Sequence, residues 1–187
     1  MHLIRGLHNL KKLNGCVLTI GNFDGVHSGH QEIIRRLTAK AKELGAPSVV
    51  ISFSVTPQTF FGRPKARLSN FRDKHMLLES LGVDKHLLIR FNKAFSETSA
   101  NSFIEEIIIG QLNARYCLIG DDFRFGKGRL GDFCLLEKYA KLGGFSADKI
   151  GDIQIKGQRV SSSAIRYCLA LGELDKAEQL LGRPYTI

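Results

Sequence analysis

The sequence lacks tryptophan, and it has no apolar run close to the roughly 20 residues that a membrane-spanning helix needs. Its opening stretch, MHLIRGLHNLKKLNG, contains no continuous apolar segment ahead of a small-residue cleavage site, so a secretory signal is not indicated. The four cysteines form no C-x-x-C pair and have no histidine at zinc-ligand spacing. These absences predict a cytoplasmic protein that has no membrane partner and carries reduced core thiols at Cys16, Cys117, Cys134 and Cys168.

The composition is that of an ordinary globular protein. The chain has 187 residues, of which 43% are hydrophobic and 24% charged, so it can bury a real core and is expected to form a single domain. Lys and Arg number 27 against 18 Asp and Glu, which gives a formal net charge of +9. Such a charge attracts nucleic acid, acidic membranes or phosphorylated small molecules, and by itself it does not choose among them.

Strand and helix patterns alternate along the first two thirds of the chain. The apolar run Cys16–Ile20 ends in a glycine turn, and Ile34, Leu37 and Ala41 then follow at helical spacing up to the stop signals Gly45 and Pro47. The buried strand 49–53 completes a βαβ unit. The pattern goes on with a helix at 72–81, a strand at 86–91, a helix at 99–112 and a strand at 116–119. This alternation predicts a doubly wound α/β fold with a parallel sheet covered on both faces.

The last third of the chain has a different pattern. A glycine-rich loop at 120–131 precedes a helix at 132–142, and the stretch 152–160 alternates around a turn at Lys156-Gly157, as a hairpin does. Two helices follow at 162–171 and 174–181. We expect a Rossmann-like domain with a small hairpin-bearing appendage.

The first strand leads into the loop GNFDGVHSGH, residues 21–30. In open α/β sheets, ligands lie beyond the carboxyl ends of the strands, where backbone N–H groups and the helix dipole attract phosphate. The loop has neither the P-loop spacing nor the dinucleotide fingerprint. His27 and His30 are three residues apart at the start of a helix, so both rings can face the phosphate and donate hydrogen bonds to it. The alternative, that one histidine merely caps the helix, is less favoured because the pair lies among three glycines.

Two further segments carry aromatic or basic side chains. Phe123 and Phe125 alternate with Arg124 in a glycine-rich loop, which suits a flavin nucleotide and a single-stranded nucleic acid about equally well. The serines 161–163 supply a helix N-cap with free N–H groups. An ordinary cap would explain them, but Arg159 and Arg166 on either side favour phosphate binding.

These motifs carry a resemblance to a known family. The ten-residue loop resembles the G-x-F-D-G-x-H-x-G-H form of the H-x-G-H motif in bacterial FAD synthetases, which are nucleotidyltransferases. GDDFRFG at 120–126 resembles the family's flavin-side loop, and RVSSSAIR at 159–166 resembles its R-[IV]-S-S-[TS]-x-[IV]-R segment. LLGRPY at 180–185 looks like the junction at which the family's riboflavin kinase module begins.

The resemblance implies an FMN adenylyltransferase, which converts ATP and FMN into FAD and diphosphate. It implies that residues 1–187 are that domain alone, that the riboflavin kinase module is absent, and that Mg²⁺ arrives with ATP rather than in a dedicated protein site. The sequence does not indicate an oligomeric state.

The same resemblance assigns roles to residues of this chain. The residues expected to act in catalysis are His27, His30 and Arg166. Those expected to bind ATP and its phosphates are Gly21, Asn22, Phe23, Asp24, Gly25, Gly29, Arg159, Ser161, Ser162 and Ser163. Those expected to bind flavin are Phe53, Pro57, Asp122, Phe123, Arg124 and Phe125. One departure concerns the family's F-x-P-x-P segment, because Val55 stands here in place of the middle proline.

Two other functions remain open from the residues alone. A related adenylyl- or cytidylyltransferase acting on another small phosphate ester would show the same phosphate machinery, although Phe123 and Phe125 would then be idle. A nucleic-acid-binding module fits the net charge, but the sequence shows no helix-turn-helix or zinc-finger spacing, and such a module gives no reason for the two histidines. We therefore expect small-molecule substrates and no nucleic acid partner.

Overall fold

The computed structural model describes residues 1–186, so that Ile187, the last residue of the predicted domain 1–187, lies outside the described residues. A six-stranded sheet with the order β1-β4-β3-β2-β5-β6 forms its centre, and every neighbouring pair of strands is parallel. The strands are β1 His2–Arg5, β2 Cys16–Ile20, β3 Ser48–Val55, β4 Lys85–Arg90, β5 Ala114–Gly120 and β6 Ser146–Ile150. The predicted parallel α/β fold is confirmed.

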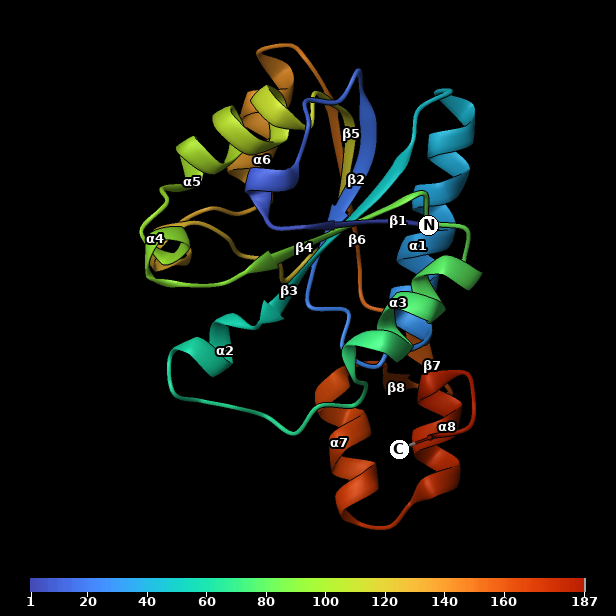
Figure 1. Cartoon of the computed structure of the whole chain (residues 1–187). Coiled ribbons are helices and arrows are strands. Elements are labelled where there is room, and N and C mark those ends of the chain that lie inside the picture. Colours follow the sequence, from blue (N-terminus) through green and yellow to red (C-terminus); the bar gives the residue numbers. More distant parts are fainter. Residues whose placement is uncertain (187) are drawn as a thin grey trace.

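Helices cover both faces of this sheet, with α1 and α3 on one side and α5 and α6 on the other (Figure 1). Successive residues of a strand point to opposite faces. Accordingly, Val17 packs in one fully buried cluster with Ile34 and Leu37 of α1, whereas Leu18 packs in another with Ile104 and Ile108. The longer helices are α1 Ser28–Glu43, α3 Phe71–Ser80, the π-helix η2 Phe103–Gln111, which continues the short α5 Ala100–Ser102, and α6 Phe133–Lys141. The short ones are η1 Leu7–Asn9, α2 Pro57–Phe60, α4 Lys93–Ser96 and η3 Lys127–Arg129.

The end of the chain forms a small appendage that lies beyond one edge of the domain, below α1 and α3 in Figure 1. It contains the hairpin strands β7 (Gln154–Ile155) and β8 (Gln158–Arg159) and the helices α7 (Ser162–Ala170) and α8 (Leu174–Leu181). Ile165, Leu180 and Leu181 belong to an apolar cluster that joins the appendage to Leu68, in the segment before α3. The predicted hairpin turn is confirmed, since Lys156 and Gly157 both have positive φ, as a two-residue hairpin loop requires.

Several elements differ from the expectation, among them the four short helices η1, α2, α4 and η3, which were not predicted. Two strands at the edges of the sheet, β1 and β6, were not predicted because each is short and has only one buried residue, Ile4 and Ile150 respectively. The expected helix at 99–112 is largely a π-helix, in which Gly110 lies close to the Glu105 carbonyl: a Cβ there would be 3.0 Å from that oxygen. Because β6 pairs with β5, the appendage begins after β6 and not directly after Gly120.

The sheet places three loops at one edge. In a parallel sheet all carboxyl ends point the same way, and β2 lies between β3 and β5, which are reached by connections on opposite sides. The loop 21–27 after β2 therefore opens beside the loops that follow β5 and β6. Within residues 1–186, no helix is both long and apolar enough to cross a lipid bilayer.

Candidate active site

The loop after β2 has a strained backbone. Phe23 and Val26 have φ values of 47° and 39°, in the left-handed region that side chains disfavour, and Gly25 between them has φ 79°. Phe23 and Val26 are almost fully buried in the apolar cluster against α1. Strain of this kind costs on the order of 1–3 kcal/mol for each residue and persists only where the surroundings enforce the conformation. The loop is therefore held in shape by its contacts.

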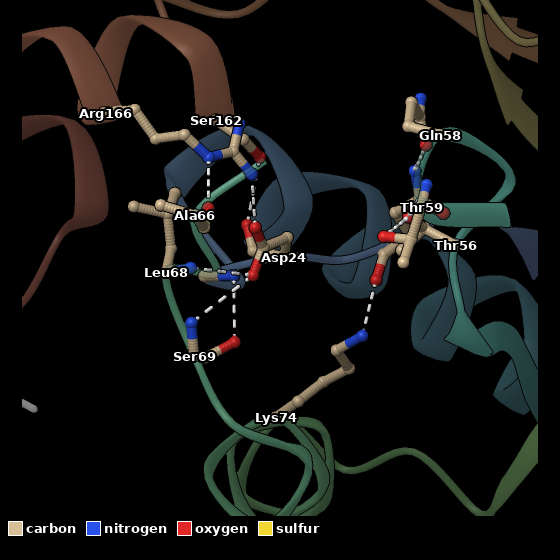
Figure 2. Close-up of polar contacts among 12 residues, drawn as sticks. Asp24, Thr56, Gln58, Thr59, Ala66, Leu68, Ser69, Lys74, Ser162 and Arg166 are labelled. Atoms are coloured by element: carbon tan, nitrogen blue, oxygen red, sulfur yellow. Dashed lines mark hydrogen bonds and ion pairs between the residues drawn. The ribbon is translucent and has the colours of Figure 1, made fainter. Parts of the chain in front are cut away.

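Asp24 is the centre of those contacts, as Figure 2 shows. Its carboxylate accepts hydrogen bonds from the backbone N–H groups of Leu68 at 3.0 Å and Ser69 at 3.3 Å, and it forms an ion pair with Arg166. Ser162 donates its hydroxyl to the Asp24 carbonyl at 3.0 Å. Asp24, Ser162 and Arg166, all predicted as site residues, thus join the loop to the start of α7.

His27 and His30 lie at the first turn of α1 with their rings stacked, 3.6 Å between centroids at an interplanar angle of 16°. His27 is the N-cap, and its Nδ1 accepts the N–H of His30 at 3.3 Å. Burial lowers the pKa of His27 to about 4, and burial together with His27 and Lys74 holds the pKa of His30 well below its usual value of 6.5. Both imidazoles are therefore neutral at pH 7. Because Nδ1 of His27 is an acceptor, its Nε2 carries the proton and can donate.

The first turn of α1 has donors to offer to an anion. The N–H groups of the first turn have no acceptor within the helix, and the positive end of the helix dipole lies there. Gly29 keeps this turn open, since a Cβ would lie 3.2 Å from Nδ1 of His27. Nδ1 of His30 is buried and lacks a hydrogen-bond partner among the described residues, a situation that costs about 1–3 kcal/mol. A phosphate group fits the free N–H groups of this turn.

A cleft of about 1260 Å³ opens in front of the two histidines. Pockets for a single small ligand usually measure roughly 300–1,000 Å³, so this cleft has room for two. Four carboxylates line it: Asp24, Asp121, Asp122 and Asp152. Nine basic side chains do so as well: Arg5, Arg63, Lys65, Arg67, Lys74, Arg124, Arg129, Arg159 and Arg166. The excess of positive charge favours phosphorylated ligands.

The cleft also brings together almost all of the predicted site residues. Each residue expected to act in catalysis, to bind phosphate or to bind flavin lines it, with the exception of Gly25. Gly25 faces the segment around Leu68: a Cβ on Gly25 would come within 3.0 Å of the Leu68 side chain, and the Gly25 N–H donates to Ser69 Oγ. Its part is to let the loop turn against the segment around Leu68.

The residues predicted to bind phosphate near α7 are partly engaged in contacts of their own. Ser161 is the N-cap of α7 and accepts the N–H of Ala164 at 3.1 Å, whereas Ser163 is exposed. Arg159 forms ion pairs with Asp152 at 2.8 Å and with Asp122 at 3.2 Å across the mouth of the cleft. The predicted helix cap is confirmed at Ser161. The first turn of α7 faces the same cavity as the first turn of α1.

The residues predicted to bind flavin are divided between the surface of the cleft and the core. Phe123 is half-buried and stacks on Phe125, 5.8 Å between centroids, while Phe125 is buried and packs against Phe103. Arg124 turns back to donate to the Phe123 carbonyl. Phe123 is thus the ring of this loop that a planar ligand could reach most readily.

An aromatic cluster that the sequence reasoning missed continues this apolar side. Phe91 lies directly after β4 and makes edge-to-face contacts with Phe53 at 6.0 Å and with Phe60 at 5.4 Å. Phe60 and Phe61 are exposed at the end of the short helix that begins at Pro57. The signal in the sequence was a pair of aromatic residues shortly after a proline. Phe53, Phe61 and Phe91 form an apolar wall in the same cleft that the first turn of α1 lines.

Lys74 is a second residue that was missed. It is 8% exposed, and its ammonium donates to the Asn22 carbonyl at 2.7 Å (Figure 2). Burial lowers its pKa from 10.5 to about 8, against the opposing effect of Asp24. The helical pattern of α3 gave no sign of it, because a lysine in an amphipathic helix normally faces solvent.

Comparison with known proteins identifies relatives along the whole chain. A family model described as FAD synthetase matches residues 9–164. The bifunctional riboflavin kinase/FMN adenylyltransferase of Haemophilus influenzae is 45% identical over 190 residues, and the protein of that name from Escherichia coli K12 is 42% identical over 191. Each match covers 100% of this chain, whereas the chain spans only 62% and 61% of the lengths of these curated relatives.

Solved structures have the same fold. A Streptococcus pneumoniae protein described as a macrolide-efflux protein superposes with a TM-score of 0.86 at 25% identity, over 98% of this chain and 62% of that one. A pantothenate synthetase from Thermus thermophilus superposes with a TM-score of 0.54 at 16% identity, over 95% of this chain and 79% of that one. The second likeness concerns the fold alone.

Proposed function

The chain belongs to the FAD synthetase family, and from this premise we propose that it is an FMN adenylyltransferase, which converts ATP and FMN into FAD and diphosphate. The observation that carries the proposal is the pair of neutral, stacked imidazoles at the start of α1, placed in a cleft with a basic side and an aromatic side. The phosphates of ATP and FMN need the basic side of the cleft, and the flavin ring needs the aromatic side. We also propose that residues 1–187 act as one domain.

The reaction is an in-line displacement at phosphorus. A phosphate oxygen of FMN forms a bond to the α-phosphorus of ATP, the bond from that phosphorus to the α–β bridging oxygen breaks, and diphosphate leaves with the electron pair. A phosphate monoester has a second pKa of about 6, so at neutral pH the nucleophile is already largely ionised and needs no strong base. This agrees with histidines whose low pKa makes them poor bases.

In this mechanism His27 and His30 stabilise charge. The Nε2–H of His27 and the free N–H groups at the first turn of α1 donate to the oxygens on which negative charge develops. A single preorganised donor of this kind typically contributes about 10²–10³ in turnover. Since the site is held before substrate arrives, the donors do not have to reorganise during the reaction.

The start of α7 would hold the leaving diphosphate. Arg166 uses Nε for the Ala66 carbonyl and Nη2 for Asp24, and over residues 1–186 its Nη1 makes no hydrogen bond, so that nitrogen is available to a phosphate. Ser161, Ser162 and Arg159 lie along the same wall of the cleft. We propose that Phe91 of the apolar wall and Phe123, which lines the same cleft, bind the isoalloxazine ring of FMN. Planar rings stack or pack edge-on with aromatic side chains.

Mg²⁺ completes the proposal as the partner of ATP. Magnesium prefers oxygen ligands, keeps several of its waters and typically uses one or two carboxylates together with substrate phosphates. Asp122, which is exposed at the cleft, suits that pattern, and the part of the chain that is described holds no group of three or more acidic, histidine or cysteine ligands. Such an ion would offset phosphate charge. Cys16, Cys117 and Cys168 are buried as predicted, but Cys134 is exposed on α6 and is not a core thiol. All four thiols are free, which fits the reducing environment of the cytoplasm, where we place the enzyme.

The test is to incubate the chain with MgATP and FMN and to separate the products by chromatography. The same assay with CTP, and with sugar or alditol phosphates as acceptors, tests the alternative of a related transferase. FAD as the only adenylylated product supports the proposal. Efficient transfer to a phosphate ester without a flavin ring, in the absence of FAD formation, would contradict it.

A further inference from the structure

Besides the Asp24 carboxylate, the carbonyl groups of the strained loop hold it in place. Four of its carbonyl oxygens accept hydrogen bonds from side chains that lie outside the loop: Asn22 from Lys74, Asp24 from Ser162, Gly25 from Arg183, and Val26 from Gln31 and Arg183. Three of the partners come from helices already described, and the fourth, Arg183, comes from the segment that follows α8.

Arg183 makes a two-pronged contact. Its Nη2 donates to the Gly25 carbonyl at 2.7 Å, and its Nη1 approaches the Val26 carbonyl at 3.5 Å. These two residues include the most strained position of the loop, since a buried valine with φ 39° is unfavourable. The next residue is His27. An arginine fork suits this task because it can bridge two acceptors at once.

The segment that carries Arg183 is tightly fitted to the start of α1. Gly182 ends α8 in the left-handed conformation with φ 73°, and a Cβ there would lie 2.8 Å from Ser28 Oγ. Gln31 donates to the Leu181 carbonyl at 2.9 Å as well as to that of Val26. The chain therefore passes against the first turn of α1 at the very place where the two imidazoles lie.

We propose that Arg183 is a positioning residue for nucleotidyl transfer: it fixes the Gly25–Val26 carbonyls and, through them, the orientation of His27 at the N-cap of α1. The inference rests on the proposed function for its chemistry and on the hydrogen bonds of the loop for its geometry. Arg183 acts through the backbone and not on the substrate, so it should affect turnover more than ground-state binding.

If Arg183 merely docked the appendage, Arg183→Ala would lose stability, and turnover would fall only because the chain unfolds. Ala177, Leu180 and Leu181 of α8 are almost fully buried in an apolar cluster that also includes Leu68, from the segment before α3. That cluster should keep α8 in place without Arg183. An Arg183→Ala variant should therefore stay folded, with a melting temperature within a few degrees of the unmodified chain.

The experiment compares Arg183→Ala and Arg183→Lys with the control Lys176→Ala in the same appendage. Lys176 is exposed, and within residues 1–186 its one ion-pair partner is Glu173, at 2.8 Å on the surface. We expect Arg183→Ala to lower kcat for FAD formation by about 10–100-fold, with KM values for ATP and FMN changed less than threefold. Arg183→Lys should recover part of the rate, added guanidinium should restore Arg183→Ala in part, and Lys176→Ala should match the unmodified chain.

An unchanged kcat in Arg183→Ala would overturn the inference, and so would a loss of rate that is equally large in Lys176→Ala or that follows only from unfolding. Amide hydrogen exchange over residues 24–31 of the full chain provides a readout that needs no catalysis, and we expect it to speed up in Arg183→Ala alone. If the unmodified chain forms no FAD, the proposed function is wrong, and exchange still decides whether Arg183 fixes the loop. Unchanged amide exchange in Arg183→Ala would refute the inference that Arg183 fixes the loop.

Discussion

Replacing Lys74 with methionine tests whether the active-site loop is held by a lysine whose charge is unfavourable to folding. Burial lowers the pKa of this lysine from 10.5 to about 8. Between these values the unfolded chain binds more protons than the folded chain, so stability should rise with pH through this window. A pKa difference of this size corresponds to about 3 kcal/mol, most of which is recovered by pH 10. Methionine has a similar volume and no charge, so the variant should lack this pH dependence.

The assay is urea unfolding of the unmodified chain, Lys74→Met and the control Lys138→Met at pH 7 and pH 10. Lys138 is exposed on α6. From pH 7 to pH 10 the unmodified chain should gain about 2 kcal/mol in free energy of unfolding relative to Lys74→Met, while Lys138→Met should follow the unmodified chain. Contributions from groups that all three proteins share cancel in the comparison. A gap between Lys74→Met and the unmodified chain that stays constant across this range would refute the reasoning.

Three further predictions concern the loop and the cleft. His30→Ala should lower kcat by about 10²–10³ and change KM for ATP less than threefold in steady-state assays, and an unaltered kcat would return His30 to a packing role. Asp24→Asn, which breaks the ion pair with Arg166, should lower the free energy of unfolding in urea by about 2 kcal/mol, whereas a loss below about 0.5 kcal/mol would disprove the importance of that pair. Phe91→Ala should raise KM for FMN about tenfold and leave KM for ATP unchanged; an equal rise in both would contradict its place in the flavin wall.

Much of the fold could be predicted from local patterns. The βαβ unit from Cys16 to Val55 combines an apolar strand, helical spacing and the stop signals Gly45 and Pro47, and each of these signals acts over a few residues. The edge strands β1 and β6 could not be predicted in this way. The burial of SADKI in β6, for example, is confined to Ile150, so its strand character comes from pairing with β5, and pairing is not visible in a short polar segment.

In the candidate site as well, features set by a local sequence pattern could be predicted and features set by long-range packing could not. The loop at 21–30 was predictable because its glycines and histidines lie within ten residues, and their spacing carries the geometry. Lys74 contacts Asn22 across 52 residues of sequence, and Arg183 contacts Gly25 across 158. Contacts over such separations are set by where α3 packs and by how the segment after α8 lies against the first turn of α1, which no local pattern encodes. The sequence therefore predicted residues that line the cleft, and the structure was needed to see which residues hold the loop in place.

The most direct test of the central claim follows the α-phosphorus of ATP. The chain is incubated with FMN and with MgATP labelled at either the α- or the γ-phosphate, and the products are separated. Transfer of the AMP group to FMN predicts that the α-label appears in FAD, that the γ-label appears in diphosphate, and that the two products form in equal amounts. An α-label that appears in AMP or ADP, with none in FAD, would contradict the account.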